Sequence, residues 1–218
     1  MRKLFDLFRK SWLIILIVLV SIPTFYRMFS PGIYSMQDFH FFRLFEFDKC
    51  VKELQIPCRW SPDAGLGYGE PLFNFYGQVS YSIGEIFHLI GFSLIDSIKI
   101  LFILSLLGSA IAMYFLAKRI WKNDFAAFVS AVLYLYAPYR AVEVWVRGAL
   151  PEALSFVLFP LILLCIDKYI EKKNLRNRIF FSVLLAILIS NHNLSFIMFA
   201  PLLILWIVFR LHQSESWK

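Results

Sequence analysis

The sequence predicts an all-α fold, that of a polytopic α-helical membrane protein. Hydrophobic residues make up 60% of the 218 residues and charged residues only 17%, whereas soluble domains average about 45–50% apolar and about 25% charged residues. Several apolar runs approach the ~20 residues that a membrane-spanning helix requires. These runs are too continuously apolar, and lie too close together, to be strands of a β-barrel.

Six apolar segments are predicted to span the membrane. The first, residues 12–29, is longer than the apolar core of about 7–15 residues that is typical of a signal peptide, so we expect it to remain uncleaved. The later five are residues 98–117, 125–138, 153–166, 179–189 and 194–211. The third to fifth segments are short for a span and are expected to extend into their flanks. Residues 77–92 are amphipathic, with Glu85 and His88, and are predicted to form an interfacial or partly inserted helix.

Basic residues indicate the orientation, because short loops rich in Lys and Arg stay in the cytoplasm. Three clusters alternate with loops that contain fewer basic residues: Arg2, Lys3, Arg9 and Lys10; Lys118, Arg119 and Lys122; and Lys168, Lys172, Lys173, Arg176 and Arg178. Six spans would place all three clusters and the N-terminus in the cytoplasm, and residues 30–95 in an outward loop. We therefore expect one transmembrane domain, residues 1–218, in the lipid bilayer of the cell membrane (plasma or inner membrane). The net charge of +7 comes mostly from these loops and does not indicate nucleic-acid binding.

Polar residues follow the first span directly, within the aromatic stretch "YSMQDFHFFRLFEF". Ser35 and Asp38 match a helix-capping box, and an acid fixed in this way is also well oriented for chemistry. Asp38 and His40 are two residues apart, so on a helix they point in nearly opposite directions and a simple dyad is not expected. His40 and Arg43 are expected to share a face.

The rest of the outward loop, "RWSPDAGLGYGEPLFNFYG", is rich in glycine, proline and aromatic residues. Turn formation and anchoring at the membrane surface explain part of this composition. The other hypothesis is a loop that lies over a cavity, with Arg59, Asp63 and Glu70 as polar contacts. Cys50 and Cys58 lie on the outward side, where a disulfide persists, but their spacing leaves the pairing open.

Two further outward stretches carry charge. In "PYRAVEVWVRGALPEA", Arg140, Glu143 and Arg147 would lie on one face of a helix, with Glu152 nearby. These charges either pair internally or include an arginine that binds an anion, since Arg matches phosphate geometry. In "SNHN", His192 is either an interfacial hydrogen-bonding residue or a ligand-binding one.

Four segments together resemble a known family: "MQDFHFFRL", "IPCRWSPDAGLGYGEPLFNFYG", "YAPYRAVEVWVRGALPEALSF" and "SNHNLSF". They resemble the 6-pyruvoyl-tetrahydropterin synthase-related membrane proteins, which are similar to the wider GT-C glycosyltransferase superfamily. The resemblance covers roughly residues 10–210, and the string from Arg59 to Gly77 is its most specific part. The chain lacks the zinc-binding histidine cluster of the soluble synthase in the family label.

The GT-C resemblance implies sugar transfer on the outer face of the membrane, from a polyprenyl-phosphate donor to a glycan, lipid or protein acceptor. Asp38 then matches the catalytic acid of the first outward loop, and His40 the second polar position. Arg140 or Arg147 would bind the lipid phosphate, and an arginine or a divalent metal ion would stabilise its departing charge. Because six spans are few for this superfamily, the chain is expected to be the N-terminal part of a longer protein. The alternative function is a non-enzymatic transporter or assembly subunit for lipid-linked or cell-envelope glycans.

Overall fold

The computed structural model describes residues 2–32 and 38–213, and the side chains of residues 12–32 and 39–213. Most of these residues are helical, with no β-strand among them, and one isolated bridge pairs Ser61 with Glu70. The long helices are α1 (Arg2–Phe25), α2 (Asp38–Lys52), α4 (Val79–Leu89), α5 (Leu94–Trp121), α6 (Asp124–Leu135), α8 (Leu150–Glu171), α9 (Leu175–Asn191) and α10 (Asn193–Gln213). The short turns are η1 (Tyr26–Phe29), η2 (Gly65–Gly67), α3 (Leu72–Phe75), α7 (Pro138–Ala141) and η3 (Val142–Arg147).

In the part of the chain that the structure describes, four segments are long and apolar enough to cross a membrane. They are Trp12–Phe29, Leu94–Trp121, Leu150–Glu171 and Asn193–Gln213. A fifth candidate is a helix pair, α6 with Pro138–Arg147, which is bent by 45° at its break. The helix α9 has 17 residues and is shorter than these four. The multi-pass helical fold is therefore confirmed, whereas the predicted count of six spans is not.

The bend after α6 explains why the third apolar segment does not form one straight span. Ala137 is not helical, as expected for a residue before proline, and Pro138 starts the next helical turn. The following segment, η3, is a π-helix and ends at Gly148, which has a positive φ of 57°. Glycine adopts this left-handed conformation without steric cost. The chain then enters α8 through Leu150.

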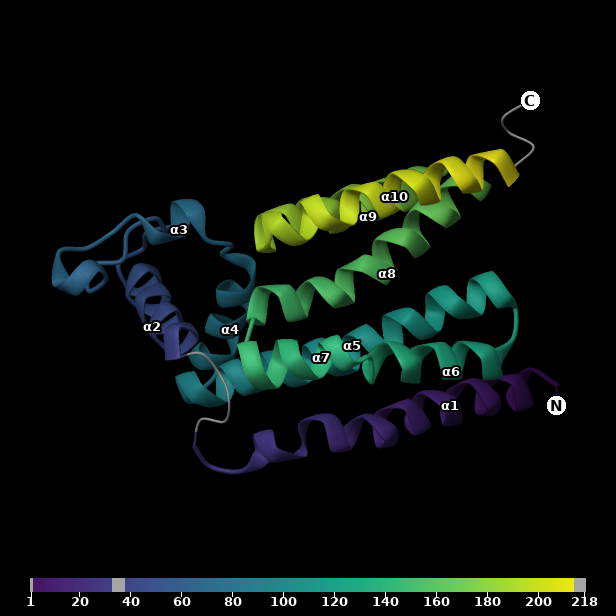
Figure 1. The fold of residues 1–218 in the computed structure, drawn as a ribbon, viewed down its shortest axis with the longest axis horizontal. Helices are drawn as coiled ribbons and strands as arrows, with labels where there is room; N and C mark the ends of the chain where they lie inside the picture. Colours follow the sequence, from purple (N-terminus) through teal and green to yellow (C-terminus); the bar gives the residue numbers. More distant parts are fainter. Residues whose placement is uncertain (1, 33–37, 214–218) are drawn as a thin grey trace.

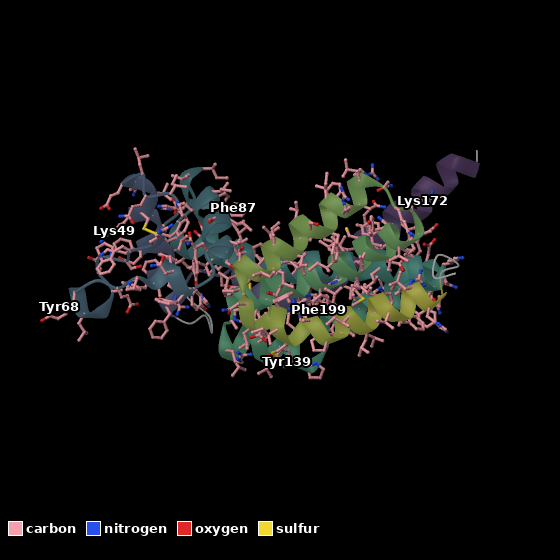
Figure 2. The ribbon with its side chains drawn as sticks, turned by 90° about the horizontal axis from the view of Figure 1, so that it is seen from above. Lys49, Tyr68, Phe87, Tyr139, Lys172 and Phe199 are labelled. Carbon is pink, nitrogen blue, oxygen red and sulfur yellow. A yellow bond between two sulfur atoms is a disulfide. The ribbon has the colours of Figure 1, made fainter. Side chains whose placement is uncertain are left out.

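The segment from α2 to α4 (residues 38–89), called the outward segment after its predicted orientation, and the basic loops lie at opposite ends of the bundle (Figure 1). The helices α2, α3 and α4 gather at one end, and the start of α1 and the end of α10 lie at the other end with the α5–α6 and α8–α9 connections. Seen from above, Lys49 and Tyr68 lie at the first end and Lys172 at the second (Figure 2). The three basic clusters thus share one end, which agrees with the topology on which the orientation argument depends.

The bundle core is built around α5, which packs against α1, α4, α6 and α8. A close approach between α5 and α8 is possible because Gly108 has no side chain. A Cβ at this position would lie 3.3 Å from both γ-carbons of Val157. Small residues at helix crossings are typical of membrane proteins. A second apolar cluster joins α8, α9 and α10 through residues such as Leu188 and Phe199.

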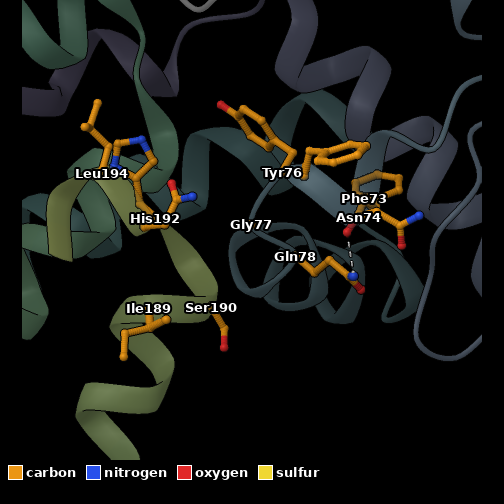
Figure 3. Close-up of a pocket in the computed structure, with 11 residues that line it drawn as sticks. Phe73, Asn74, Tyr76, Gly77, Gln78, Ile189, Ser190, His192 and Leu194 are labelled. Carbon is orange, nitrogen blue, oxygen red and sulfur yellow. Dashed lines mark hydrogen bonds between the residues drawn. The ribbon is translucent and has the colours of Figure 1, made fainter. Parts of the chain in front are cut away.

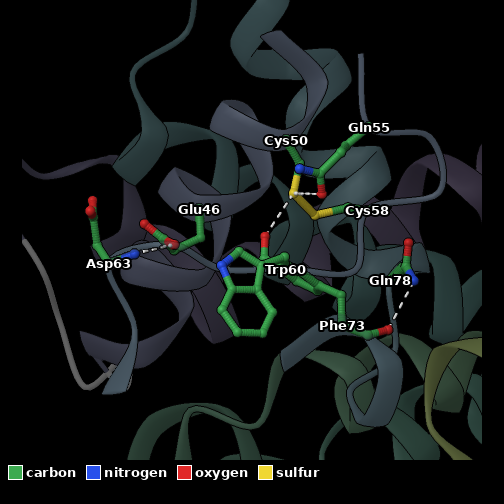
Figure 4. The surroundings of a disulfide bond; sticks show 8 residues. All are labelled: Glu46, Cys50, Gln55, Cys58, Trp60, Asp63, Phe73 and Gln78. Carbon is green, nitrogen blue, oxygen red and sulfur yellow. Dashed lines mark hydrogen bonds between the residues drawn. A yellow bond between two sulfur atoms is a disulfide. The ribbon is translucent and has the colours of Figure 1, made fainter. Parts of the chain in front are cut away.

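A disulfide (Figure 4) and an aromatic cluster around Phe73 stabilise the outward segment. Cys50 and Cys58 are bonded, with their Cα atoms 5.5 Å apart, so the structure forms the pairing that the sequence left open. Phe73 packs edge-to-face against Phe47 and Tyr81, with ring centroids 5.3 and 5.9 Å apart. This core connects α2, α3 and α4 and positions the loop that follows α3.

Candidate functional site

A cavity of about 610 Å³ lies between the outward segment and the ends of α9 and α10 (Figure 3). One wall is the stretch Phe73, Asn74, Phe75, Tyr76, Gly77 and Gln78, and the other is Ile189, Ser190, His192, Asn193 and Leu194. The candidate span α10 begins at Asn193. The cavity therefore lies at one end of a candidate membrane span. Its lining combines aromatic rings and amides with the aliphatic side chains of Ile189 and Leu194.

The two walls touch at Gly77. A Cβ added there would lie 1.8 Å from the carbonyl oxygen of Asn191, so only glycine allows the backbones to approach this closely. The buried Asn191 side chain extends the junction. Its Oδ1 accepts a 2.6 Å hydrogen bond from Ser80 Oγ, and its Nδ2 donates to the Pro151 carbonyl at 2.6 Å. One amide thus connects α4, α8 and α9 beside the cavity.

Outside the cavity lining, a charged pair interacts with His192. Arg147 pairs with Glu152 at 3.0 Å and donates to the Tyr139 hydroxyl at 2.8 Å. The Arg147 side chain is 47% exposed, which leaves part of its guanidinium free to bind a ligand. Burial lowers the pKa of His192, with opposing contributions from the charges of Glu152 and Arg147. These charges act on the imidazole, but neither Arg147 nor Glu152 is among the residues that line the cavity. His192 Nδ1 lies 2.6 Å from Ser195 Oγ.

The expectation that Arg140, Glu143 and Arg147 share one face is wrong. In the π-helical η3 the side chains are spaced differently from those of an α-helix. Arg140 is buried and donates to Glu143 at 2.9 Å and to Ser109 Oγ at 3.2 Å, whereas Arg147 points to the exterior. The Arg140 guanidinium also lies over the Phe156 ring, 4.4 Å from its centroid. Arg140 and Glu143 therefore form the internal pair that the sequence left as one alternative.

His40 is buried where α2 meets the start of α8. Its Nε2 lies 2.6 Å from the Gly148 carbonyl, so this nitrogen carries the proton and donates. The other nitrogen, Nδ1, then accepts from the Tyr81 hydroxyl at 2.8 Å. Burial, followed by the charge of Arg43, lowers the pKa of His40 to about 4, and the hydrogen bond to Gly148 opposes this shift. The imidazole is thus neutral at physiological pH and holds the outward segment to the bundle.

Arg43 lies next to the same group and behind the cavity wall. Its guanidinium stacks 3.8 Å from the centroid of the Tyr76 ring, and Tyr76 lines the cavity. The charge of Arg43 acts on His40 and on Tyr81. His40 and Arg43 therefore both interact with Tyr81 from one side of α2, as their spacing predicted.

The loop residues Arg59, Asp63 and Glu70 are exposed and do not line the cavity. Asp63 pairs with Lys49, whose ammonium lowers the pKa of this carboxyl. The Asp63 backbone N–H donates to Glu46 at 3.1 Å, and burial raises the pKa of Glu46. Glu70 contributes its backbone to the bridge with Ser61. The contacts of Asp63 hold the loop against α2, and the bridge of Glu70 closes the loop on itself.

Asp38 is the first residue of α2, but its side chain lies outside the described part of the structure. The capping and catalytic hypotheses for Asp38 both stay predictions. Within the described residues, no group of three or more His, Cys, Asp or Glu side chains is placed to hold a metal ion.

A comparison with protein families shows which family the chain belongs to. A family model described as "6-pyruvoyl-tetrahydropterin synthase related domain; membrane protein" matches residues 73–217, which is most of the chain. The chain belongs to this family. No curated protein sequence matches it, and no solved structure does.

The match to the 6-pyruvoyl-tetrahydropterin synthase-related family includes both walls of the cavity and the Arg147–Glu152 pair. It begins at Phe73, so it leaves out Asp38, His40 and Arg43. It also leaves out most of the string from Arg59 to Gly77 that the sequence favoured as the most specific part. The family resemblance is therefore confirmed over a shorter range than expected.

The sequence analysis did not identify Asn191 as a residue that positions the site. The motif "SNHN" drew attention to His192 because imidazole is a frequent ligand. The available signal was position: Asn191 ends α9 directly before the polar turn, and an amide buried there needs several hydrogen-bond partners. Those partners, Ser80 and Pro151, are distant in the sequence, so the spacing of motifs does not reveal them.

Proposed function

We propose that this chain binds a polyprenyl-phosphate-linked sugar at the outward end of its helix bundle and transfers the sugar to an acceptor. The observation that carries the proposal is the cavity of about 610 Å³ at the start of α10. The Arg147–Glu152 pair does not line this cavity, but its charges act on His192, which does. An amphiphilic ligand fits this position, because its lipid chain stays in the bilayer while its head group reaches polar side chains. Multi-pass helical structure and family membership support a membrane setting.

The lining matches the chemistry of such a donor. The ring of Tyr76 offers an apolar face to a sugar, while Asn74, Gln78 and Asn193 offer amides to its hydroxyls. Arg147 is the arginine for the phosphate, because its planar fork suits phosphate oxygens and it is partly exposed. Arg140 is held by Glu143 and Ser109 and supports the site from inside. Ile189 and Leu194 face the position of the prenyl chain.

The proposed reaction moves one glycosyl group. The acceptor hydroxyl attacks the anomeric carbon, and the bond from that carbon to the phosphate oxygen breaks. Asp38 takes the proton of the hydroxyl as general base. The polyprenyl phosphate leaves with its negative charge stabilised by Arg147.

Two features support an outward-facing site. The cavity lies at the end of the bundle opposite the basic loops, and such loops stay in the cytoplasm. The Cys50–Cys58 disulfide lies at the same end of the bundle as the cavity, and disulfides persist in oxidising compartments.

The test follows a radiolabelled hexose from undecaprenyl phosphate to acceptors in membranes that contain equal amounts of each protein. Asp38→Asn should lower transfer by about 10²–10⁴-fold, the usual contribution of a general base. Asn caps a helix as well as Asp does, so a purely capping role predicts nearly normal transfer. Arg147→Lys keeps the charge but loses the fork and should also lower transfer, whereas the exposed Arg59→Lys is the matched control. Transfer by the parent protein no higher than in membranes without it would contradict the proposal.

A further inference from the structure

A second cavity lies at the opposite end of the bundle, between the end of α5 and α8. Its volume is about 630 Å³. Its lining consists of four basic and two apolar side chains: Lys118, Arg119, Lys122, Lys168, Phe115 and Leu164. No carboxylate is among these lining residues. The proposed sugar transfer does not involve this end of the molecule.

Two of the four cations already have partners. Lys118 pairs with Asp124, and Arg119 pairs with Asp167 and Glu171. Lys122 and Lys168 differ from them. Both are exposed, and neither side chain forms an ion pair with any residue that the structure describes. The two ammonium groups come from different helices and converge on one cavity, where an anion would neutralise both.

The apolar lining indicates what kind of anion fits. Phe115 and Leu164 lie on α5 and α8, which are both candidate spans, one to two turns before the basic residues. Phe115 is 43% exposed. A ligand at this position meets aliphatic and aromatic surface on its bilayer side and ammonium groups on its water side. Basic pockets between membrane helices bind anionic lipid head groups in this way.

We infer that this cavity binds the phosphate of an anionic phospholipid, with Lys122 and Lys168 as the principal contacts. Lys118 and Arg119 are held by their carboxylate partners and add little charge, and Phe115 contacts the upper part of an acyl chain. A free phosphate would use the cations but gain nothing from the apolar lining. The lipid therefore binds more tightly than the free ion.

The experiment measures lipid binding to the purified full chain in detergent by native mass spectrometry. The probes are phosphatidylglycerol and phosphatidylcholine with identical acyl chains, and inorganic phosphate is the competitor. The test variant is Lys122→Asn with Lys168→Gln. Lys122 has a positive φ of 52° at the end of α5, and asparagine tolerates this conformation, so the helix end is preserved. The matched control, Lys173→Gln with Arg178→Gln, removes the same charge from exposed residues of the same end that do not line this cavity.

Phosphatidylglycerol should bind the parent at least ~10-fold more tightly than phosphatidylcholine, and the test variant should lose ~10-fold or more of that affinity. The control should stay within roughly twofold of the parent. An equal loss of phosphatidylglycerol affinity in both double variants would show that binding depends on the overall charge of this end and not on the cavity, and would overturn the inference. Complete displacement of the lipid by equimolar inorganic phosphate would overturn it too, in favour of a small-anion site. Thermal unfolding without added lipid confirms that both variants are folded.

Discussion

Gly77→Ala tests whether the two walls of the outward cavity depend on one backbone contact. The new methyl carbon would lie 1.8 Å from the Asn191 carbonyl oxygen and 2.5 Å from its carbonyl carbon. An ordinary carbon–oxygen contact is no shorter than about 3.3 Å. The segment before α4 must therefore move away from the end of α9 by roughly 1.5 Å.

This movement breaks a second interaction. The Ser80 Oγ to Asn191 Oδ1 distance would increase from 2.6 Å to about 4 Å, beyond hydrogen-bonding range. Steric strain in a packed site costs about 1–3 kcal/mol, and a buried polar group without its partner costs about 1–3 kcal/mol more. The free energy of unfolding should then fall by about 2–6 kcal/mol. For a chain of this size the melting temperature should fall by roughly 5–20 °C.

The assay is thermal unfolding in detergent, combined with the transfer assay at a temperature where the variant is folded. Transfer should fall by about 10²-fold, because a displacement of about 1 Å at a binding site has this effect. Gly108→Ala is the matched control. Its new methyl would meet only the side chain of Val157 at 3.3 Å, which can shift, and alanine favours the helix. A melting temperature and transfer rate for Gly77→Ala equal to those of the control would refute the close contact at Asn191.

Three further measurements test other parts of the structure. Because the pKa of His40 is lowered to about 4 in the folded state, the unfolded state binds more protons below pH 6.5, and stability should be lost as the pH falls from there towards 4. The free energy of unfolding should fall by about 2 kcal/mol at pH 5 relative to pH 8, and His40→Gln should lose this part of the pH dependence in unfolding titrations. For the orientation, a membrane-impermeant maleimide should label Tyr68→Cys in intact cells, whereas Lys173→Cys should need permeabilised cells; the reverse pattern would place the cavity in the cytoplasm. Reduction of the Cys50–Cys58 disulfide should lower stability by about 2–3 kcal/mol through the unfolded state, and reductant should leave the melting temperature of Cys50→Ser unchanged.

The length and apolar character of the segments made the helices predictable from the sequence. Each predicted span coincides largely with a helix, because a chain in lipid satisfies its backbone hydrogen bonds by forming helices. The break between α6 and η3 was not predictable from hydropathy. It depends on Pro138, which ends one helix and starts the next, and on Gly148, which turns the chain back into α8.

The candidate site was predictable by region but not by role. The topology predicted from the sequence placed four candidate residues at one end of the molecule: His40, Arg147, Glu152 and His192. It did not separate the buried residues from the exposed ones, because burial depends on partners far along the chain. His40 illustrates this point: its partners are Tyr81 and Gly148, which lie 41 and 108 residues away.

Burial also divides the polar residues of the outward end into two kinds. Asn191 and His40 are almost fully inaccessible, and their hydrogen bonds join the outward segment to α8 and α9. A buried polar group that has its partners fixes one arrangement, since any other leaves it without them. Arg147, by contrast, has a partly exposed side chain. Substitutions of the first kind should therefore lower stability and transfer together. Arg147→Lys should lower transfer in a protein with the parent melting temperature, and an equal loss of stability would assign Arg147 a structural role instead.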